Sequence, residues 1–168
     1  MALVLQSMFW ESQILRSRWR EDKDIQPPLP VGEGTEAVRE ERHMPVIDHQ
    51  TIPEVLMRPG IRGQFLAHKN LGAAGVSLLV NTVEPGAAAP LHKHTVEETM
   101  LVLAGTVWVR VGEEYATVGP NHTVIIPAGT PHAWGNNGAE VARLLWAFAG
   151  PDPFADATYL EGQPPQTA

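Results

Sequence analysis

The chain has 168 residues, enough for one domain with or without a tail. Its 12 Lys and Arg against 19 Asp and Glu give a net charge of −7, which opposes binding to nucleic acid. It lacks cysteine, which excludes disulfides and thiolate chemistry, and no apolar run approaches the roughly 20 residues that cross a bilayer. With 15 Gly and 15 Pro, the composition favours many short elements joined by turns, and we therefore expect a soluble all-β domain.

Residues 1–44 differ from the rest and form an N-terminal extension. Residues 8–24 could form one short amphipathic helix, and residues 25–42 have the Pro/Gly-rich and charged composition of a linker. Two interpretations stay open. Either translation of the functional protein starts at Met44, or the extension carries a helix that packs on the domain or on a partner subunit.

From residue 45 onward the signals are those of strands. Short β-rich runs bounded by Gly, Pro or Asn, without long helices between them, predict a sandwich or barrel over residues 45–150. The runs are 63–68, 75–84, 98–103, 106–111, 115–118, 122–126 and 141–148. Short turns within 98–118 predict a meander of antiparallel neighbours. Residues 151–168 read as a polar, Pro-rich C-terminal tail with room for one helical turn near Phe154–Leu160.

The stretch around His92 carries the chemistry. His92 and His94 are two residues apart, so on a strand both imidazoles lie on one face and Lys93 on the other. Two neutral imidazoles directed at one point make a natural site for a borderline metal. Glu98 opens the next strand and can turn inward beside them, whereas Glu97 should point outward.

A second stretch, from Pro127 to Asn136, places His132 at the start of a strand after a Pro/Gly turn. Together the two stretches resemble the motifs of the cupin superfamily. The first motif is matched by Gly86, His92, His94, Glu98 and Gly105, and the second by Pro127, Gly129, His132 and Asn136. The departure is Asn121, which stands where the second motif begins with Gly; Asn tolerates left-handed backbone angles, so the turn can survive.

The resemblance implies a small antiparallel jelly-roll barrel. It also implies one divalent transition metal held by His92, His94, Glu98 and His132. Three imidazoles and one carboxylate suit Fe, Mn, Ni, Zn or Cu without selecting one. The alternative is a cupin that keeps these side chains without metal, which would bury ionisable groups at a cost.

Strand alternation suggests the pocket walls. Met100 and Val102 share a face with Glu98, and Trp134 shares one with His132; plain core packing is the alternative for each. The inward faces of 76–84 and 141–148 stay undetermined. The remaining side chains of interest are expected at the surface: His43, His49, His68, His122, Arg58, Arg62, Arg143 and Trp108. For the three arginines, the alternative is that they pair with a substrate carboxylate.

We therefore expect a metal-dependent enzyme of oxygenase type, acting on a small neutral or weakly acidic substrate, with Glu98 as ligand or base. The sparse basic residues beside the motifs weigh against a phosphorylated substrate. The alternatives are a metal-dependent isomerase or decarboxylase, a non-enzymatic binding or sensor module, and a structural metal. We also expect a homodimer, and a cytoplasmic location because no secretion signal is recognisable.

Overall fold

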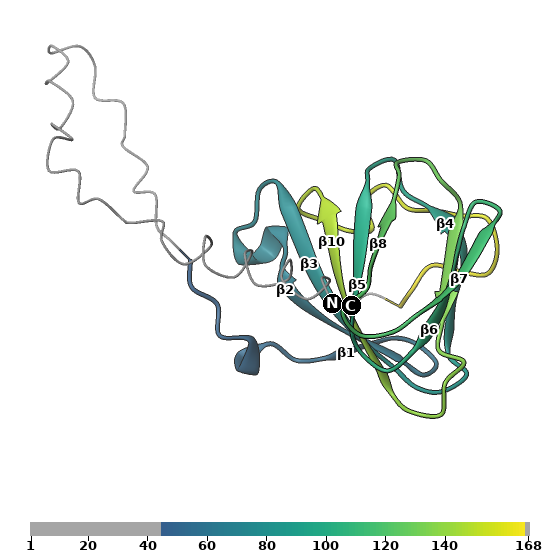
Figure 1. The fold of residues 1–168 in the computed structure, drawn as a ribbon. Helices are drawn as coiled ribbons and strands as arrows, with labels where there is room; N and C mark the ends of the chain where they lie inside the picture. The colour runs from purple at the N-terminus through teal and green to yellow at the C-terminus, as the bar shows by residue number, and fades with distance from the viewer. Residues whose placement is uncertain (1–44, 167–168) are drawn as a thin grey trace, which may run out of the picture. The chain divides into compact units, whose positions relative to one another are not determined.

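The computed structural model describes residues 45–166, so the helix and linker predicted within residues 1–44 lie outside the described part. Two antiparallel sheets face each other (Figure 1). The first has the order β1 (Val55–Arg58), β2 (Ile61–Ala67), β3 (Val76–Val83), β10 (Ala142–Ala149), β5 (Glu98–Ala104) and β8 (Thr123–Ile126). The second has the order β11 (Thr158–Tyr159), β4 (Ala88–Lys93), β9 (His132–Gly135), β6 (Val107–Val111) and β7 (Glu114–Val118).

This arrangement is the expected all-β jelly roll. Two single-turn 3-10 helices, η1 (His49–Thr51) and η2 (Lys69–Leu71), are the helical elements of the described residues. Neither is long and apolar enough to cross a membrane.

The hydrophobic core lies between the two sheets. Burial against it shows which faces of β3 and β10 point inward, which the sequence left undetermined. In β10, Leu144, Trp146 and Phe148 are buried and Arg143 points outward. In β3, Leu79 and the alternate residues on its face turn inward. Full burial of each large apolar side chain contributes roughly 1.5–3 kcal/mol, so the alternation fixes the register of both strands.

The predicted meander contains two antiparallel pairings, and the structure has only one of them. β6 pairs with β7 as expected, but β5 lies between β10 and β8 in the other sheet. Gly105 makes the turn between β5 and β6 with φ +75°, and a Cβ there would come within 2.7 Å of the Ala142 Cα. The turn is therefore a crossing between sheets, and a side chain at this position would clash with the neighbouring strand.

The turn at Asn121 keeps the geometry that the motif requires. Its φ is +66°, and among residues 45–166 no other non-glycine residue has a positive φ. Asn is one of the few residues that adopt this conformation at low cost. The expectation that the turn survives the missing glycine is confirmed.

The segment after β10 packs on the barrel. Residues 153–156 form turns instead of the helical turn considered for this region, and β11 then pairs with β4. Beyond β11, the Leu160 N–H donates to the Leu91 carbonyl (2.9 Å) and the Gln166 N–H donates to the Met57 carbonyl (2.8 Å). These backbone bonds tie the segment to both sheets.

Candidate metal centre

Three histidines from two neighbouring strands converge inside the barrel. His92 lies in β4, His94 directly follows that strand, and His132 begins β9, where it pairs with His92. Each offers one ring nitrogen, and these three atoms lie within 4.8 Å of one another. All three residues are buried, so the group is shielded from bulk water.

Each imidazole is oriented by a hydrogen bond from its Nδ1 to an acceptor outside the group. Carbonyl and carboxylate oxygens accept only, so each Nδ1 carries a proton, and in the neutral ring the Nε2 then presents its lone pair. The acceptors are the Pro90 carbonyl for His92 (2.7 Å), the Thr130 carbonyl for His132 (3.0 Å) and the Asp156 carboxylate for His94 (3.2 Å). The three rings are thus set in the tautomer that metal ligands use.

Glu98 opens β5 and lies against this group. It is 2% exposed, and its Oε1 is 2.9 Å from Nε2 of His132. The contact is not aligned as a hydrogen bond, and neither atom has another partner among the described residues. Two lone-pair atoms this close repel each other unless a proton or a cation lies between them. The donor set therefore fits a metal ion, with Glu98 beside the three imidazoles.

His92 is held in its neutral form. Burial, and after it the nearby His132, lowers its pKa to about 3, although the bond to the Pro90 carbonyl acts in the opposite direction. A neutral imidazole is the form that binds a metal, so the site does not have to lose a proton at neutral pH before His92 can bind.

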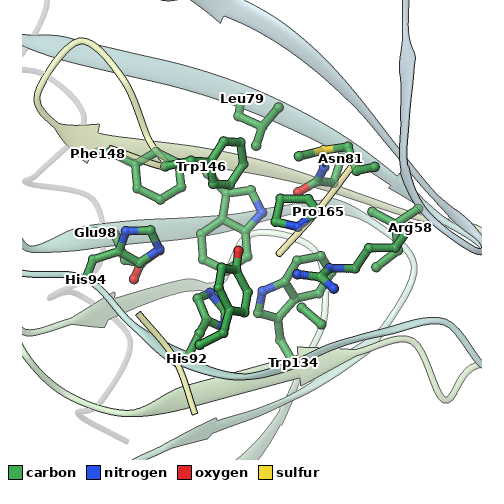
Figure 2. Close-up of a pocket in the computed structure, with 15 residues that line it drawn as sticks. Arg58, Leu79, Asn81, His92, His94, Glu98, Trp134, Trp146, Phe148 and Pro165 are labelled. Carbon is green, nitrogen blue, oxygen red and sulfur yellow. Dashed lines mark hydrogen bonds between the residues drawn. The ribbon is translucent and has the colours of Figure 1, made fainter. Parts of the chain in front are cut away.

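A cavity of about 40 Å³ opens beside the imidazoles (Figure 2). It receives side chains from both sheets and from the segment that follows β10. Its lining residues are Met57, Arg58, Ile61, Leu79, Asn81, Ala89, His92, His94, Glu98, Trp134, Trp146, Phe148, Phe154, Tyr159 and Pro165. The lining is mostly apolar and aromatic, with the polar groups gathered at a few points, as in small-molecule sites.

Two of the three predicted wall residues lie elsewhere. Trp134 lines the cavity, but Met100 and Val102 are buried in the hydrophobic core and are not among its lining residues. They do face inward like Glu98. Val102 lies four residues beyond Glu98, roughly 14 Å along β5 at about 3.4 Å per residue. Met100 pairs with the lining residue Trp146 on the neighbouring strand but is not itself a lining residue. Alternation predicted the face of the strand correctly, but sharing that face did not bring these two side chains to the cavity.

The segment after β10 supplies wall residues that sequence reasoning missed. The Tyr159 ring stacks on His92, with centroids 5.3 Å apart and planes 13° apart. Arg58 of β1, predicted as a surface charge with a carboxylate partner as the alternative, also lines the cavity, and its guanidinium lies 5.2 Å from the centre of the Tyr159 ring. Neither strand was predicted: β1 has four residues and β11 has two, too short for a periodic signal.

The other singled-out residues lie mostly away from the site. Glu97, His49 and His122 are exposed, as expected. His68 is partly buried and accepts a hydrogen bond from the Asn70 N–H at the start of η2. His43 lies outside the described residues.

Fold and site define a small jelly-roll protein with a buried histidine group that could bind a metal. Residues 79–148 match the family described as Cupin domain. The resemblance to the cupin superfamily that the two motifs predicted is therefore confirmed for this part of the chain.

The chain is also similar to proteins of several different names. It is 28% identical to auxin-binding protein 1 of Arabidopsis thaliana, over 66% of this chain and 61% of that protein. It is 42% identical to mannose-1-phosphate guanylyltransferase of Salmonella muenchen, over 41% of this chain and 15% of that protein. The chain thus spans less than two thirds of either relative.

Solved structures share the fold at low identity. The polyketide cyclase RemF from Streptomyces resistomycificus superposes with a TM-score of 0.62 at 20% identity, covering 72% of this chain and 88% of that one. Oxalate decarboxylase from Bacillus subtilis gives a TM-score of 0.58 at 20% identity, covering 68% of this chain and 31% of that one. At this identity, the likeness concerns the fold.

Proposed function

We propose that the protein is a metal-dependent enzyme of oxygenase type that acts on a small neutral or weakly acidic organic substrate. The supporting observation is the 2.9 Å contact between His132 Nε2 and Glu98 Oε1, two buried acceptors without another partner among the described residues. A divalent cation held by His92, His94, His132 and Glu98 would relieve that repulsion. Three imidazoles and a carboxylate suit Fe, Mn, Ni, Zn or Cu.

The chain's own residues divide the remaining work. When bound, the metal supplies a Lewis acid, or a redox centre, for substrate oxygens. Trp134, Trp146 and Phe148 wall the cavity and exclude bulk water, which strengthens electrostatic interactions inside it. Glu98 Oε1 is the carboxylate oxygen placed to hold the cation, or to accept a proton from a weakly acidic substrate.

The cavity limits the size of the substrate. Its volume of about 40 Å³ is well below the roughly 300–1,000 Å³ of sites for drug-sized ligands. Anything larger than a few heavy atoms would have to extend beyond the cavity. We therefore place the reacting part of the substrate inside and any larger remainder outside.

A binding or sensor module is the second candidate. Glu98 is the acidic residue among those that line the cavity, so an acid–base pair independent of the metal is not evident there. Similarity to a protein named for binding auxin favours the same alternative. An isomerase or decarboxylase would use the same metal to polarise its substrate without consuming oxygen.

Oxygen uptake separates these candidates. Protein loaded in turn with Fe(II), Mn(II), Ni(II), Cu(II) or Zn(II) is mixed with catechols, flavonols and β-diketones in an oxygen electrode, and products are followed by mass spectrometry. We expect uptake with a redox-active metal and one substrate class, and a large loss in Glu98→Gln. Conversion without uptake supports the isomerase or decarboxylase, and saturable binding without conversion supports the binding module.

We further propose that the chain forms a homodimer in the cytoplasm. Exposed apolar side chains on two strands at the ends of their sheets, Tyr115 of β7 and Ile125 of β8, support pairing. Light scattering at micromolar concentration should give twice the chain mass, reduced in a Tyr115→Glu/Ile125→Glu variant. A wild-type monomer contradicts the dimer. The location stays a prediction that cell fractionation can test.

A further inference from the structure

The cavity contains a buried donor whose hydrogen bond is missing. Trp146 is 2% exposed and lines the cavity, and its indole Nε1–H has no acceptor among the described residues. An unpaired buried donor is destabilising, because it has lost its hydrogen bond to water without gaining another. A ligand oxygen at this point would recover that free energy.

A cationic donor lines the same cavity. Arg58 projects from the end of β1, and its Nη1 donates to the Gln163 carbonyl at 2.6 Å. A guanidinium has five N–H donors in a planar fork, so several are left for a ligand. Within residues 45–166, no carboxylate lies within ion-pair distance of Arg58. Arg62, by contrast, is paired with Glu54 (2.9 Å) and Glu84 (3.3 Å).

Arg58 lies on the side of the cavity away from the carboxylate. Figure 2 shows Arg58 on the side opposite His94 and Glu98, with Trp146 between them. Glu98 supplies the acidic group at the metal end, and Arg58 supplies the basic group at the other. The cavity is therefore polarised along its length, with a carboxylate at one end, a guanidinium at the other and the Trp146 indole between them.

We propose that Arg58 and Trp146 form a subsite for a carboxylate, so that the ligand is a small organic acid. The carboxylate lies in the fork of Arg58, one of its oxygens accepts from the Trp146 indole, and the rest of the molecule extends toward His92. This assignment names the substrate class of the site proposed above and relies on that proposal for the metal end of the ligand. The subsite itself needs no metal.

The test compares a carboxylate with its neutral amide. Acetate and acetamide have nearly the same size, and both carry a carbonyl oxygen, but only acetate carries the charge that Arg58 would neutralise. Charge-assisted hydrogen bonds contribute roughly 1.5–3 kcal/mol, and every 1.4 kcal/mol changes an equilibrium constant about tenfold. We therefore expect wild-type protein to prefer acetate by about 10-fold or more.

Both probes are titrated by NMR at pH 7 and constant ionic strength, into metal-free and Zn(II)-loaded full-length protein. Arg58→Gln should abolish the preference for acetate in both forms, and Trp146→Phe should weaken acetate binding several-fold while keeping the ring. The matched control Arg62→Gln removes an arginine that does not line the cavity and should leave the preference unchanged. Thermal melts of each variant show whether it is folded.

Because Arg58 also holds Gln163, Arg58→Lys covers the case in which Arg58→Gln fails to fold. The lysine keeps the charge and should retain part of the preference. The subsite is overturned if acetate and acetamide bind equally, or if folded Arg58→Gln keeps the full preference. A preference seen only with Zn(II), and unaffected by Arg58→Gln, also overturns it, since the metal alone would then hold the carboxylate. A preference that persists in metal-free protein, beside a failed oxygen assay, supports the subsite and contradicts the oxygenase.

Discussion

His132 at the start of β9 and Asn136 just after its end are both buried, but they differ in how fully their polar atoms are hydrogen-bonded. Asn136, 1% exposed, donates from its Nδ2 to the carbonyls of Val83 (2.9 Å) and Glu140 (2.8 Å) and accepts from the Gly138 N–H (2.9 Å). His132, 0% exposed, has its Nε2 facing the carboxylate of Glu98 with no aligned hydrogen bond.

The difference separates two reasons for burying a polar side chain. The amide of Asn136 ties β3 to the turn before β10, and its hydrogen bonds compensate for its burial. The lone pair of His132 is aimed at a point that the protein itself does not fill. The unpaired group therefore marks the site where a ligand is expected.

The largest effect should follow loss of one imidazole. His132→Ala should weaken metal binding by about 60-fold or more, because binding free energies of roughly 10–16 kcal/mol are shared among four ligands. The variant also loses the Nδ1–H bond to the Thr130 carbonyl (3.0 Å) and leaves a small cavity, so the stability of the metal-free protein should fall as well. Competition with a chromogenic chelator gives the affinity, and His122→Ala, at an exposed histidine, is the matched control. Equal affinities in both variants contradict the site.

The counterpart at the satisfied group should show the opposite pattern. Asn136→Ala should lower the free energy of unfolding by about 2–3 kcal/mol, because two carbonyls and one N–H lose their partner. Metal affinity should change less than threefold. Urea denaturation and the same chelator competition measure both quantities. If Asn136→Ala abolished metal binding in a folded protein, the division between the two groups would be wrong.

A smaller effect is expected at the carboxylate that orients one ligand. Asp156 accepts from His94 Nδ1 (3.2 Å) and also from the backbone N–H of Thr95 (2.6 Å). Loss of such outer partners typically costs 10–100-fold in metal affinity. The loss of metal affinity in Asp156→Ala should fall in that range. The loss in Asp156→Asn should lie near its lower end, because the amide oxygen can still accept a hydrogen bond.

Asp152→Asn is the control for that series. This residue lies in the same segment but pairs with Lys69 (2.7 Å) and lies 3.9 Å from His68, which is not one of the three histidines of the metal group. Its affinity for metal should equal that of the wild type. With Mn(II) bound, electron paramagnetic resonance should report a changed ligand field in the Asp156 variants alone. An unchanged spectrum and affinity would show that Asp156 serves only to attach the segment.

The smallest effect concerns the pH dependence of the metal-free protein. Burial lowers the pKa of His92 to about 3, whereas an unfolded histidine titrates near about 6.5. Below about pH 6.5 the unfolded state therefore binds a proton that the folded state does not, and stability falls as the pH falls. The loss should be about 1 kcal/mol between pH 6.5 and 5.5. Urea titrations should show this slope in the wild type and less of it in His92→Gln; equal slopes would contradict the assigned burial effect.

Sequence reasoning reached the parts of the fold that follow local patterns. Alternation and turn residues predicted most strands, and the spacing of His92 and His94 placed both imidazoles on one side. Bringing His132 to them depended on resemblance to a family, because pairing between β4 and β9 is a long-range event that no local pattern contains.

The rest could not be found in the sequence for the same reason. Arg58, Asp156 and Tyr159 reach the site through strands or turns of four residues or fewer, and such segments carry no measurable period. The segment after β10 looks polar and Pro-rich, yet backbone hydrogen bonds to Leu91 and Met57 hold it against the barrel. Which of its residues reach the cavity depends on its contacts with both sheets, which only the assembled fold determines.

Metal content per chain tests the central claim most directly. Full-length protein is equilibrated with a slight excess of one divalent transition metal, dialysed against metal-free buffer and analysed for metal and protein together. We predict one ion per chain for the wild type and less than a tenth of that for His92→Ala/His132→Ala. Retention of no metal by the wild type, or of equal amounts by the folded double variant, would contradict a cation shared by these histidines.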